Sequence, residues 1–158
     1  MRYTVGVASM KVSTNKGDLI VTHALGSCLG IAIHDPVACV GGLLHVMLPS
    51  STIDPAKAAE NPCMFVDTGV PKLFQECYKA NAQRKRLVVK VAGGAAFRDE
   101  DDLFAIGKRN YIVLRKLFWK NGIMIAAEDV GGTISRTMFL DIATGRTWIR
   151  SGDREWEL

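Results

Sequence analysis

The chain has 158 residues, of which 48% are hydrophobic and 23% are charged, and its formal net charge is +4. This length and composition are ordinary for a globular protein, so we expect one domain over residues 1–158. No apolar run approaches the roughly 18 residues that a membrane span needs, and the first residues lack the apolar segment of a signal peptide. The sequence therefore predicts a cytoplasmic protein without membrane insertion.

The cysteines and the basic residues exclude several classes of function. Four irregularly spaced cysteines contain no C-x-x-C pair, which argues against a zinc site or a disulfide framework and fits a reducing compartment. No pattern points to a metal or another cofactor. The basic cluster at residues 84–86 has no interleaved aromatic residues, so we expect a solvated connector and no nucleic acid. A basic face of this kind can also meet an acidic protein partner.

The N-terminal part of the chain predicts short strands joined by turns. Residues 3–7 alternate weakly in hydropathy and predict a first strand. A turn over residues 15–18 separates it from a second strand over residues 19–22. The second strand leads into the small-residue corner Gly26-Ser27, where backbone N–H groups can converge ahead of Cys28.

Two apolar runs, residues 29–33 and 40–48, flank the turn signal Asp35-Pro36 and predict a β-hairpin. A loop centred on this turn pairs residues whose numbers sum to 73, which sets Cys28 directly opposite His45. Directly opposed residues on one face of an antiparallel pair have Cβ atoms about 4.5–5.5 Å apart. This separation suits a cysteine nucleophile and its base.

The hairpin alone leaves alternatives open. The same register pairs His34 with Cys39, but this couple lies beside the turn, where we expect exposure and no pocket. The small residues Gly30 and Ala32 share the face of Cys28 and leave room above the sheet. On the other interpretation, Cys28 is a small buried hydrophobic residue and the opposed histidine is a half-buried structural one.

The middle of the chain predicts a loop and then a helix. Residues 50–62 are polar and form the longest predicted loop, either a lid or docking edge for substrate or a plain surface loop. The apolar stripe from Val70 to Tyr78 has helical spacing, and either Asp67 or Thr68 can cap the start of this helix.

A buried strand is predicted over residues 86–92, followed by the pair Gly93-Gly94. Such a pair allows the close approach of a backbone, or it can offer N–H groups to an oxyanion. The acidic run at residues 99–102 is typical of a solvated loop. A second helix is predicted over residues 110–120, with Asn110 as its N-cap.

The C-terminal part predicts a buried strand over residues 123–127, a hairpin of residues 137–142 with 146–150, and a fraying tail over residues 151–158. Many strands and only two clear helices define the predicted fold class as α+β. We expect a single-domain, layered β-structure, mixed or antiparallel, with two main helices packed outside.

Five sequence blocks fit one pattern, of which the first two are specific at their separation, whereas any one block alone is a weak signal. They are Thr22…Leu25-Gly26-Ser27-Cys28, His45-Val46-Met47-Leu48-Pro49, Ala92-Gly93-Gly94-Ala95, Ile106-Gly107-Lys108-Arg109-Asn110 and Glu128-Asp129-Val130-Gly131-Gly132. Through these blocks the chain resembles the CheD family of chemoreceptor glutamine deamidases, over about residues 6–150. One departure is Ser135 before Arg136, where many relatives carry glycine; it affects a local turn and not the chemistry.

The resemblance implies a fold, a substrate and partners. The fold would be similar to that of the deamidating bacterial toxins, which are cysteine hydrolases. The substrate would be the cytoplasmic helices of chemoreceptors, modified during adaptation in chemotaxis. The CheC phosphatase would be a binding partner.

The resemblance also implies a catalytic set: Cys28 as nucleophile, His45 as its base and Thr22 as the residue that orients the imidazole. In this scheme His45 lowers the pKa of the thiol through an ion pair and then protonates the departing ammonia. Water then hydrolyses a γ-glutamyl thioester to leave glutamate. The backbone N–H of Cys28 is the natural donor to the oxyanion.

Two other functions stay open from the sequence. One is a regulatory binding module that acts mainly through CheC or receptor binding, with chemistry secondary. The other is a general thiol hydrolase or a redox sensor built on Cys28, although no second cysteine lies close to it in sequence.

Overall fold

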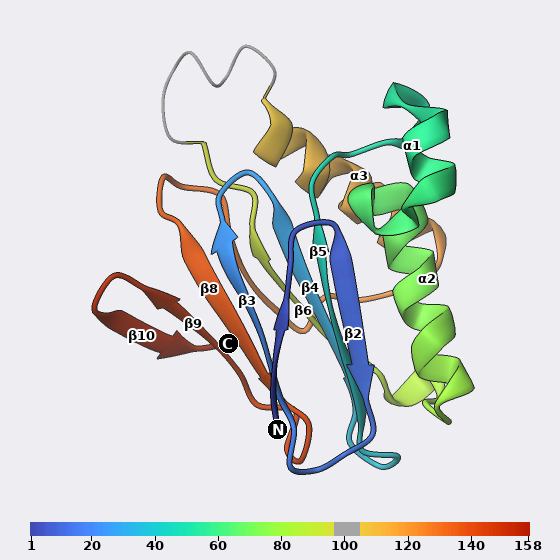
Figure 1. Ribbon diagram of the computed structural model, residues 1–158, viewed down its shortest axis with the longest axis vertical. Coiled ribbons are helices and arrows are strands. Elements are labelled where there is room, and N and C mark those ends of the chain that lie inside the picture. Colours follow the sequence, from blue (N-terminus) through green and yellow to red (C-terminus); the bar gives the residue numbers. More distant parts are fainter. Residues whose placement is uncertain (97–104) are drawn as a thin grey trace.

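The computed structural model describes residues 1–96 and 105–158, so the acidic run at 99–102 lies outside the described residues. The described strands form two five-stranded sheets (Figure 1). The first sheet has the order β1 (Arg2–Val5), β3 (Leu19–Leu25), β8 (Arg136–Asp141), β9 (Thr147–Ser151) and β10 (Arg154–Glu157). The second has the order β2 (Ser9–Ser13), β5 (Val40–Val46), β4 (Leu29–Asp35), β6 (Val88–Gly93) and β7 (Ala127–Val130).

Both sheets mix parallel and antiparallel pairs. The pairs β1–β3 and β6–β7 are parallel, and the other described pairs are antiparallel. The helices α2 (Val66–Lys79) and α3 (Ile106–Lys120) lie outside the second sheet, and the short α1 (Pro55–Glu60) precedes them (Figure 1). The α+β class, with mixed sheets and two main helices outside, is therefore confirmed. No helix in the described part of the chain is long and apolar enough to cross a membrane.

The central strands β4 and β5 are buried on both faces, because the second sheet is covered on one side by helices and on the other by the first sheet. Leu29, Ile31 and Ile33 pack in the cluster shared with α2 and α3. Ala32 and Leu43 pack in the cluster between the sheets. The alternation of side chains along each strand therefore assigns every residue to one of two separate cores.

The predicted register of the β4–β5 hairpin is wrong by two residues. Gly30, and not Cys28, lies opposite His45, and paired residue numbers sum to 75. The reason is a four-residue turn between Asp35 and Val40. In this turn the Asp35 carboxylate accepts hydrogen bonds from the backbone N–H groups of Val37 at 2.9 Å and Ala38 at 3.1 Å. A shift of two residues keeps every side chain on its predicted face.

The predicted exposure of His34 is also wrong. His34 lies opposite Gly41, is only 3% exposed and faces the first sheet. Its Nε2 is 2.8 Å from the carbonyl oxygen of Ile142. The predicted pairing with Cys39 does not form, because Cys39 lies within the turn with a φ of 53°.

Several predicted elements differ in extent. The strand β2 was not predicted, because as an edge strand it is only half-buried and shows no clear alternation. The predicted loop over residues 50–62 is largely helical, since Asp54 caps α1 and Pro55 is its first residue. The α2 helix begins at Val66 without a side-chain cap, and Asp67 instead accepts hydrogen bonds from Ser51.

The C-terminal region departs from the prediction at two places. The strand predicted over residues 123–127 begins only at Ala127, and Met124 is 85% exposed. The predicted fraying tail forms β10, which pairs with β9. The Trp156 indole N–H donates to Asp129 at 2.7 Å, which ties this strand to the end of β7.

Candidate active site

The corner Gly26-Ser27-Cys28 carries the chain from the first sheet to the second, because β3 ends at Leu25 and β4 begins at Leu29. Just before the corner, the register of β3 against β8 shifts, and Ala24 has a left-handed φ of 58°. Such bulges bend a strand and redirect its side chains. The corner therefore brings Cys28 to the edge of the inter-sheet space.

The three carbonyl groups of this corner are all fixed by hydrogen bonds. The N–H of Ala95 donates to Gly26 at 2.9 Å, and the N–H of Gly94 donates to Cys28 at 2.9 Å. The carbonyl of Ser27 accepts a hydrogen bond from a side chain of α3 at 3.0 Å. Among the described residues, no backbone carbonyl accepts a hydrogen bond from the N–H groups of Ser27 and Cys28, which makes these two groups the candidate donors to a ligand.

Gly93 allows the backbone of the Gly93-Gly94 pair to approach the carbonyl of Cys28. Its φ is 110°, and a Cβ atom at this position would lie 2.2 Å from the carbonyl oxygen of Cys28. Of the two predicted uses of the Gly93-Gly94 pair, the structure has the close approach of a backbone, because the N–H of Gly94 is already bonded to Cys28.

Replacing Gly93 by alanine is expected to lower the free energy of unfolding by at least about 2 kcal/mol, because the added methyl group meets both an unfavourable φ and the Cys28 carbonyl. Urea denaturation measures this change. Gly152→Ala is the matched control, since Gly152 also has a positive φ, 61°, but open space around its Cβ position. Equal losses in the two variants would contradict the packing role of Gly93.

His45 is held in one orientation by Thr22. The imidazole is fully buried, and its Nδ1 is 2.7 Å from the hydroxyl oxygen of Thr22 across the space between the sheets. The same hydroxyl donates its only proton to the carbonyl of Val5 at 2.8 Å. Nδ1 must therefore carry a proton and donate it to Thr22, which leaves Nε2 as an unprotonated acceptor.

The free Nε2 of His45 is the chemically available atom of this site. It is buried and has no hydrogen-bond partner among the described residues. A buried acceptor without a partner is costly and is uncommon in folded proteins. The ring is thus prepared to accept a proton from a group that enters the space between the sheets.

Cys28 lies on the same face of the second sheet as His45, but not directly opposite. Its half-buried side chain packs against the inter-sheet cluster. When the register of the hairpin is continued, Cys28 becomes the diagonal neighbour of His45. Diagonal neighbours typically lie about 7–8 Å apart, with their Cβ atoms somewhat closer. The room predicted above Gly30 is filled, since a Cβ there would lie 2.8 Å from the sulfur of Met138.

The electrostatics favour a neutral thiol and a neutral imidazole in the resting site. Burial raises the pKa of the Cys28 thiol, although its own backbone N–H opposes this shift. Burial also lowers the pKa of His45. Both shifts disfavour the charged forms, so the structure does not support the thiolate–imidazolium pair predicted from sequence.

Comparisons with known proteins agree with the resemblance. The model of the family described as "CheD chemotactic sensory transduction" matches residues 47–151. A protein of Solibacter usitatus named "Probable chemoreceptor glutamine deamidase CheD" is 51% identical over 154 residues, which cover 98% of this chain and 91% of that protein. The chain belongs to the CheD family.

Two further relatives extend this similarity. "Probable chemoreceptor glutamine deamidase CheD 1" of Syntrophus aciditrophicus is 50% identical over 93% of this chain and 92% of its own length. "Probable chemoreceptor glutamine deamidase CheD 2" of Anaeromyxobacter dehalogenans is 41% identical over 96% and 95%. The CheD model match begins after Cys28 and His45, so membership of the family does not depend on the geometry of these two residues.

Asn110 also contacts the candidate site of this CheD-family chain. Its predicted position as the N-cap of a helix is wrong. It is not an N-cap but lies inside α3, which begins four residues earlier, and it is fully buried. Its Nδ2 donates to the carbonyl of Ser27 at 3.0 Å and to that of Met47 at 3.1 Å. One side chain thus joins the corner that carries the thiol to the segment after His45. The only signal in the sequence was its place in a block of the family resemblance.

Asn110→Ala is expected to lower kcat for the family's reaction ten- to hundredfold with little change in KM, because displacing the corner by about 1 Å is enough for such a loss. Steady-state kinetics measure it. Asn121→Ala is the control, since that side chain bonds within the exposed end of the same helix, to Leu117. An unchanged kcat in folded Asn110→Ala would contradict the bridging role.

Arg136 ties the segment Asp129–Gly132 to the end of β6 at Gly93. Arg136 is buried, and its guanidinium donates to the carbonyls of Gly93 at 3.3 Å and Gly131 at 2.9 Å. It also pairs with Asp129 at 3.3 Å. No cluster of three potential metal ligands occurs in the described ranges, 1–96 and 105–158.

Proposed function

We propose that this chain is a protein-glutamine deamidase that converts glutamine side chains of chemoreceptors to glutamate. The observation that carries the proposal is the buried His45, tethered through Nδ1 to Thr22 and with a free Nε2 on the face that also carries Cys28. A thiol and an oriented base are what amide hydrolysis through a covalent intermediate requires. The names of the relatives supply the substrate class.

The proposed reaction begins with a neutral pair. As the sulfur of Cys28 attacks the carboxamide carbon, the thiol proton moves to Nε2 of His45. The N–H groups of Ser27 and Cys28, which donate to no carbonyl in the described part of the chain, are the proposed donors to the oxyanion, and each such donor is typically worth about 2.7–4 kcal/mol. The imidazolium then gives its proton to the nitrogen, which leaves as ammonia.

Hydrolysis of the thioester completes the cycle. A water molecule attacks the γ-glutamyl carbon while Nε2 of His45 accepts one of its protons. The C–S bond breaks, and the proton returns to the sulfur of Cys28. The net reaction consumes glutamine and water and yields glutamate and ammonia, so no oxidant, metal or other cofactor is required.

The test is site-specific mass spectrometry of a chemoreceptor cytoplasmic fragment incubated with this protein. Conversion of particular glutamines to glutamate, each raising the mass by about 1 Da, is the expected result. It should be lost in Cys28→Ala and retained in Cys39→Ala, which removes a half-buried thiol at the hairpin turn. A fragment that stays unmodified by the folded, reduced protein would refute the proposal.

Thr22→Val is expected to lower kcat/KM ten- to hundredfold, because the nearly isosteric side chain cannot accept the Nδ1–H bond that orients His45. Thr22→Ser keeps the hydroxyl and should restore most of the activity. Initial-rate measurements on the same receptor fragment distinguish the two variants. Activity that survives in Thr22→Val but is lost in Thr22→Ser would mean that the methyl group, and not the hydrogen bond, matters.

We also propose CheC phosphatase as a partner, on the basis of the family resemblance, and the cytoplasm as the place of action. The alternative of a mainly regulatory binding module makes a distinct prediction. In that case Cys28→Ala would bind CheC and fully complement a deletion strain despite having no deamidase activity. Loss of complementation with retained CheC binding would support the enzyme.

A further inference from the structure

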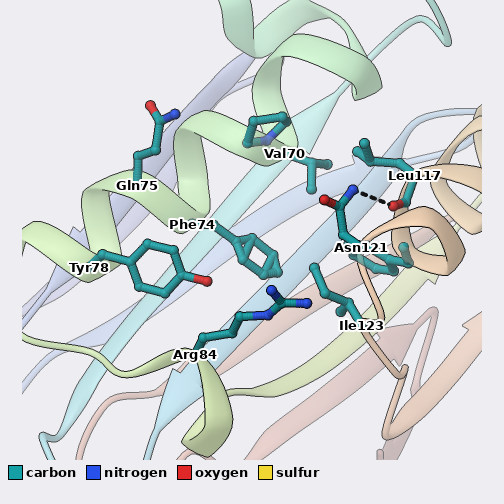
Figure 2. A pocket seen from close by; sticks show the side chains of 10 residues that line it. Val70, Phe74, Gln75, Tyr78, Arg84, Leu117, Asn121 and Ile123 are labelled. Carbon is teal, nitrogen blue, oxygen red and sulfur yellow. Dashed lines mark hydrogen bonds between the residues drawn. The ribbon is translucent and has the colours of Figure 1, made fainter.

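Three hollows lie in succession on the helix side of the molecule, around Ile123. The first, about 530 Å³, lies between α2 and α3, and Figure 2 shows Phe74 and Ile123 among its labelled lining residues. The second, about 550 Å³, shares Phe74, Arg84 and Ile123 with the first. The third, about 450 Å³, shares Ile123 and Met124 with the second. We call these three adjoining hollows together the helix-end groove.

The helix-end groove combines an apolar floor with exposed apolar side chains. Trp119 is 83% exposed and Met124 is 85% exposed, and both line the third hollow. Large apolar side chains that gather at a concave surface are typical of interaction sites, whereas single exposed ones are ordinary. The groove lies outside the second sheet, while Cys28 and His45 face the space between the sheets. It is therefore separate from the catalytic site.

The charge of the helix-end groove has one sign. Among its lining residues are Arg84, Lys85, Arg115 and Lys116, and none of the lining residues is Asp or Glu. In the basic cluster predicted as a connector, Arg86 is paired with the buried Asp35 at 2.9 Å. Arg84, in contrast, forms no ion pair with the described residues, and Figure 2 shows its guanidinium turned toward Phe74.

We propose that the helix-end groove binds an amphipathic helix of an acidic protein partner. Apolar side chains on successive turns of a helix would fill the three hollows, as in other helix-in-groove complexes. Carboxylates flanking that apolar stripe would meet the four basic side chains. A nucleic acid would leave the apolar hollows unfilled, and a flat membrane surface does not fit a concave one. This inference is independent of the deamidase proposal.

The test is NMR titration of the full chain with a synthetic 18-residue helical peptide that carries Leu along one face and Glu beside it. The Trp119 indole N–H and the Met124 methyl group are the reporters, and we expect their signals to shift. A peptide of the same composition, with its Leu residues distributed around the helix, should bind at least tenfold more weakly, because it cannot fill the hollows with one face.

Charge reversal identifies the contribution of the cations. Arg84→Glu with Lys85→Glu should weaken binding of the peptide at least tenfold, because it places like charges opposite each other. Lys16→Glu with Lys57→Glu changes the net charge equally at exposed positions away from the groove and should leave the affinity unchanged. Binding should also weaken as the salt concentration rises.

Several outcomes would overturn the proposal. One is the absence of shifts at Trp119 and Met124, and another is equal binding of the two peptides. Tighter binding of phosphatidylglycerol vesicles or of oligothymidylate would assign the groove to a membrane or to nucleic acid. Concentration-dependent self-association that shifts the same signals would assign it to a second copy of the chain.

Discussion

Replacing Cys28 by alanine is expected to lower kcat for deamidation by about 10⁴-fold or more, because the covalent route through the thioester is lost entirely. The fold should survive, since the side chain is half-buried and alanine is only slightly smaller. Ammonia release and glutamate formation on a receptor fragment measure the loss. The urea midpoint of the variant checks that the protein is folded.

Interception of the intermediate gives an independent readout of the same prediction. Hydroxylamine should divert the γ-glutamyl thioester to a hydroxamate in the native protein and in Cys39→Ala, but not in Cys28→Ala. Formation of hydroxamate by Cys28→Ala would show that another group attacks the amide. Cys63 and Cys77 are poor substitutes, because both thiols are buried in the cluster on the helix side of the second sheet, away from His45.

Replacing His45 by glutamine is expected to lower kcat by about 10³-fold, because the thiol loses its base and the ammonia loses its acid. The double variant with Cys28→Ala should be no worse than Cys28→Ala alone, since the two residues act as a unit. Single-turnover kinetics on the receptor fragment measure both. Additive losses in the double variant would contradict a shared step.

The dependence on pH follows from the neutral resting state. His45 must be unprotonated to accept the thiol proton, and burial lowers its pKa from the ordinary 6.5. Activity should therefore hold as the pH falls to about 6.5 and decline only below that value. An ion pair would make activity decline as the imidazolium loses its proton at higher pH. A profile of kcat/KM against pH separates the two cases.

Stability should follow pH in the same direction. The unfolded chain binds a proton at His45 near pH 6.5, whereas the folded protein binds it only at lower pH. The unfolded state therefore carries more protons as the pH falls below 6.5, and the contribution of His45 to stability decreases. The loss should be absent in His45→Gln, which is measurable by denaturation at pH 7.5 and 5.5.

The sequence by itself determined which residues share a face. The alternation along residues 29–33 and 40–46 assigned Cys28 and His45 to one side of the hairpin, and a register error of two residues did not change this. Such periodicity is local, since successive side chains of a strand point to opposite faces whatever the strand pairs with. The two main helices were predictable because the helical spacing of their apolar residues is likewise a local pattern.

Only the tertiary structure decided the distances within the site. The hairpin register depended on a four-residue turn held by the Asp35 carboxylate, which hydropathy does not reveal. The contact of Thr22 with His45 joins two different sheets, so no spacing along the chain encodes it. Asn110 reaches the corner from α3, 83 residues from Ser27. These contacts depend on how separate elements pack, and packing is a property of the whole chain.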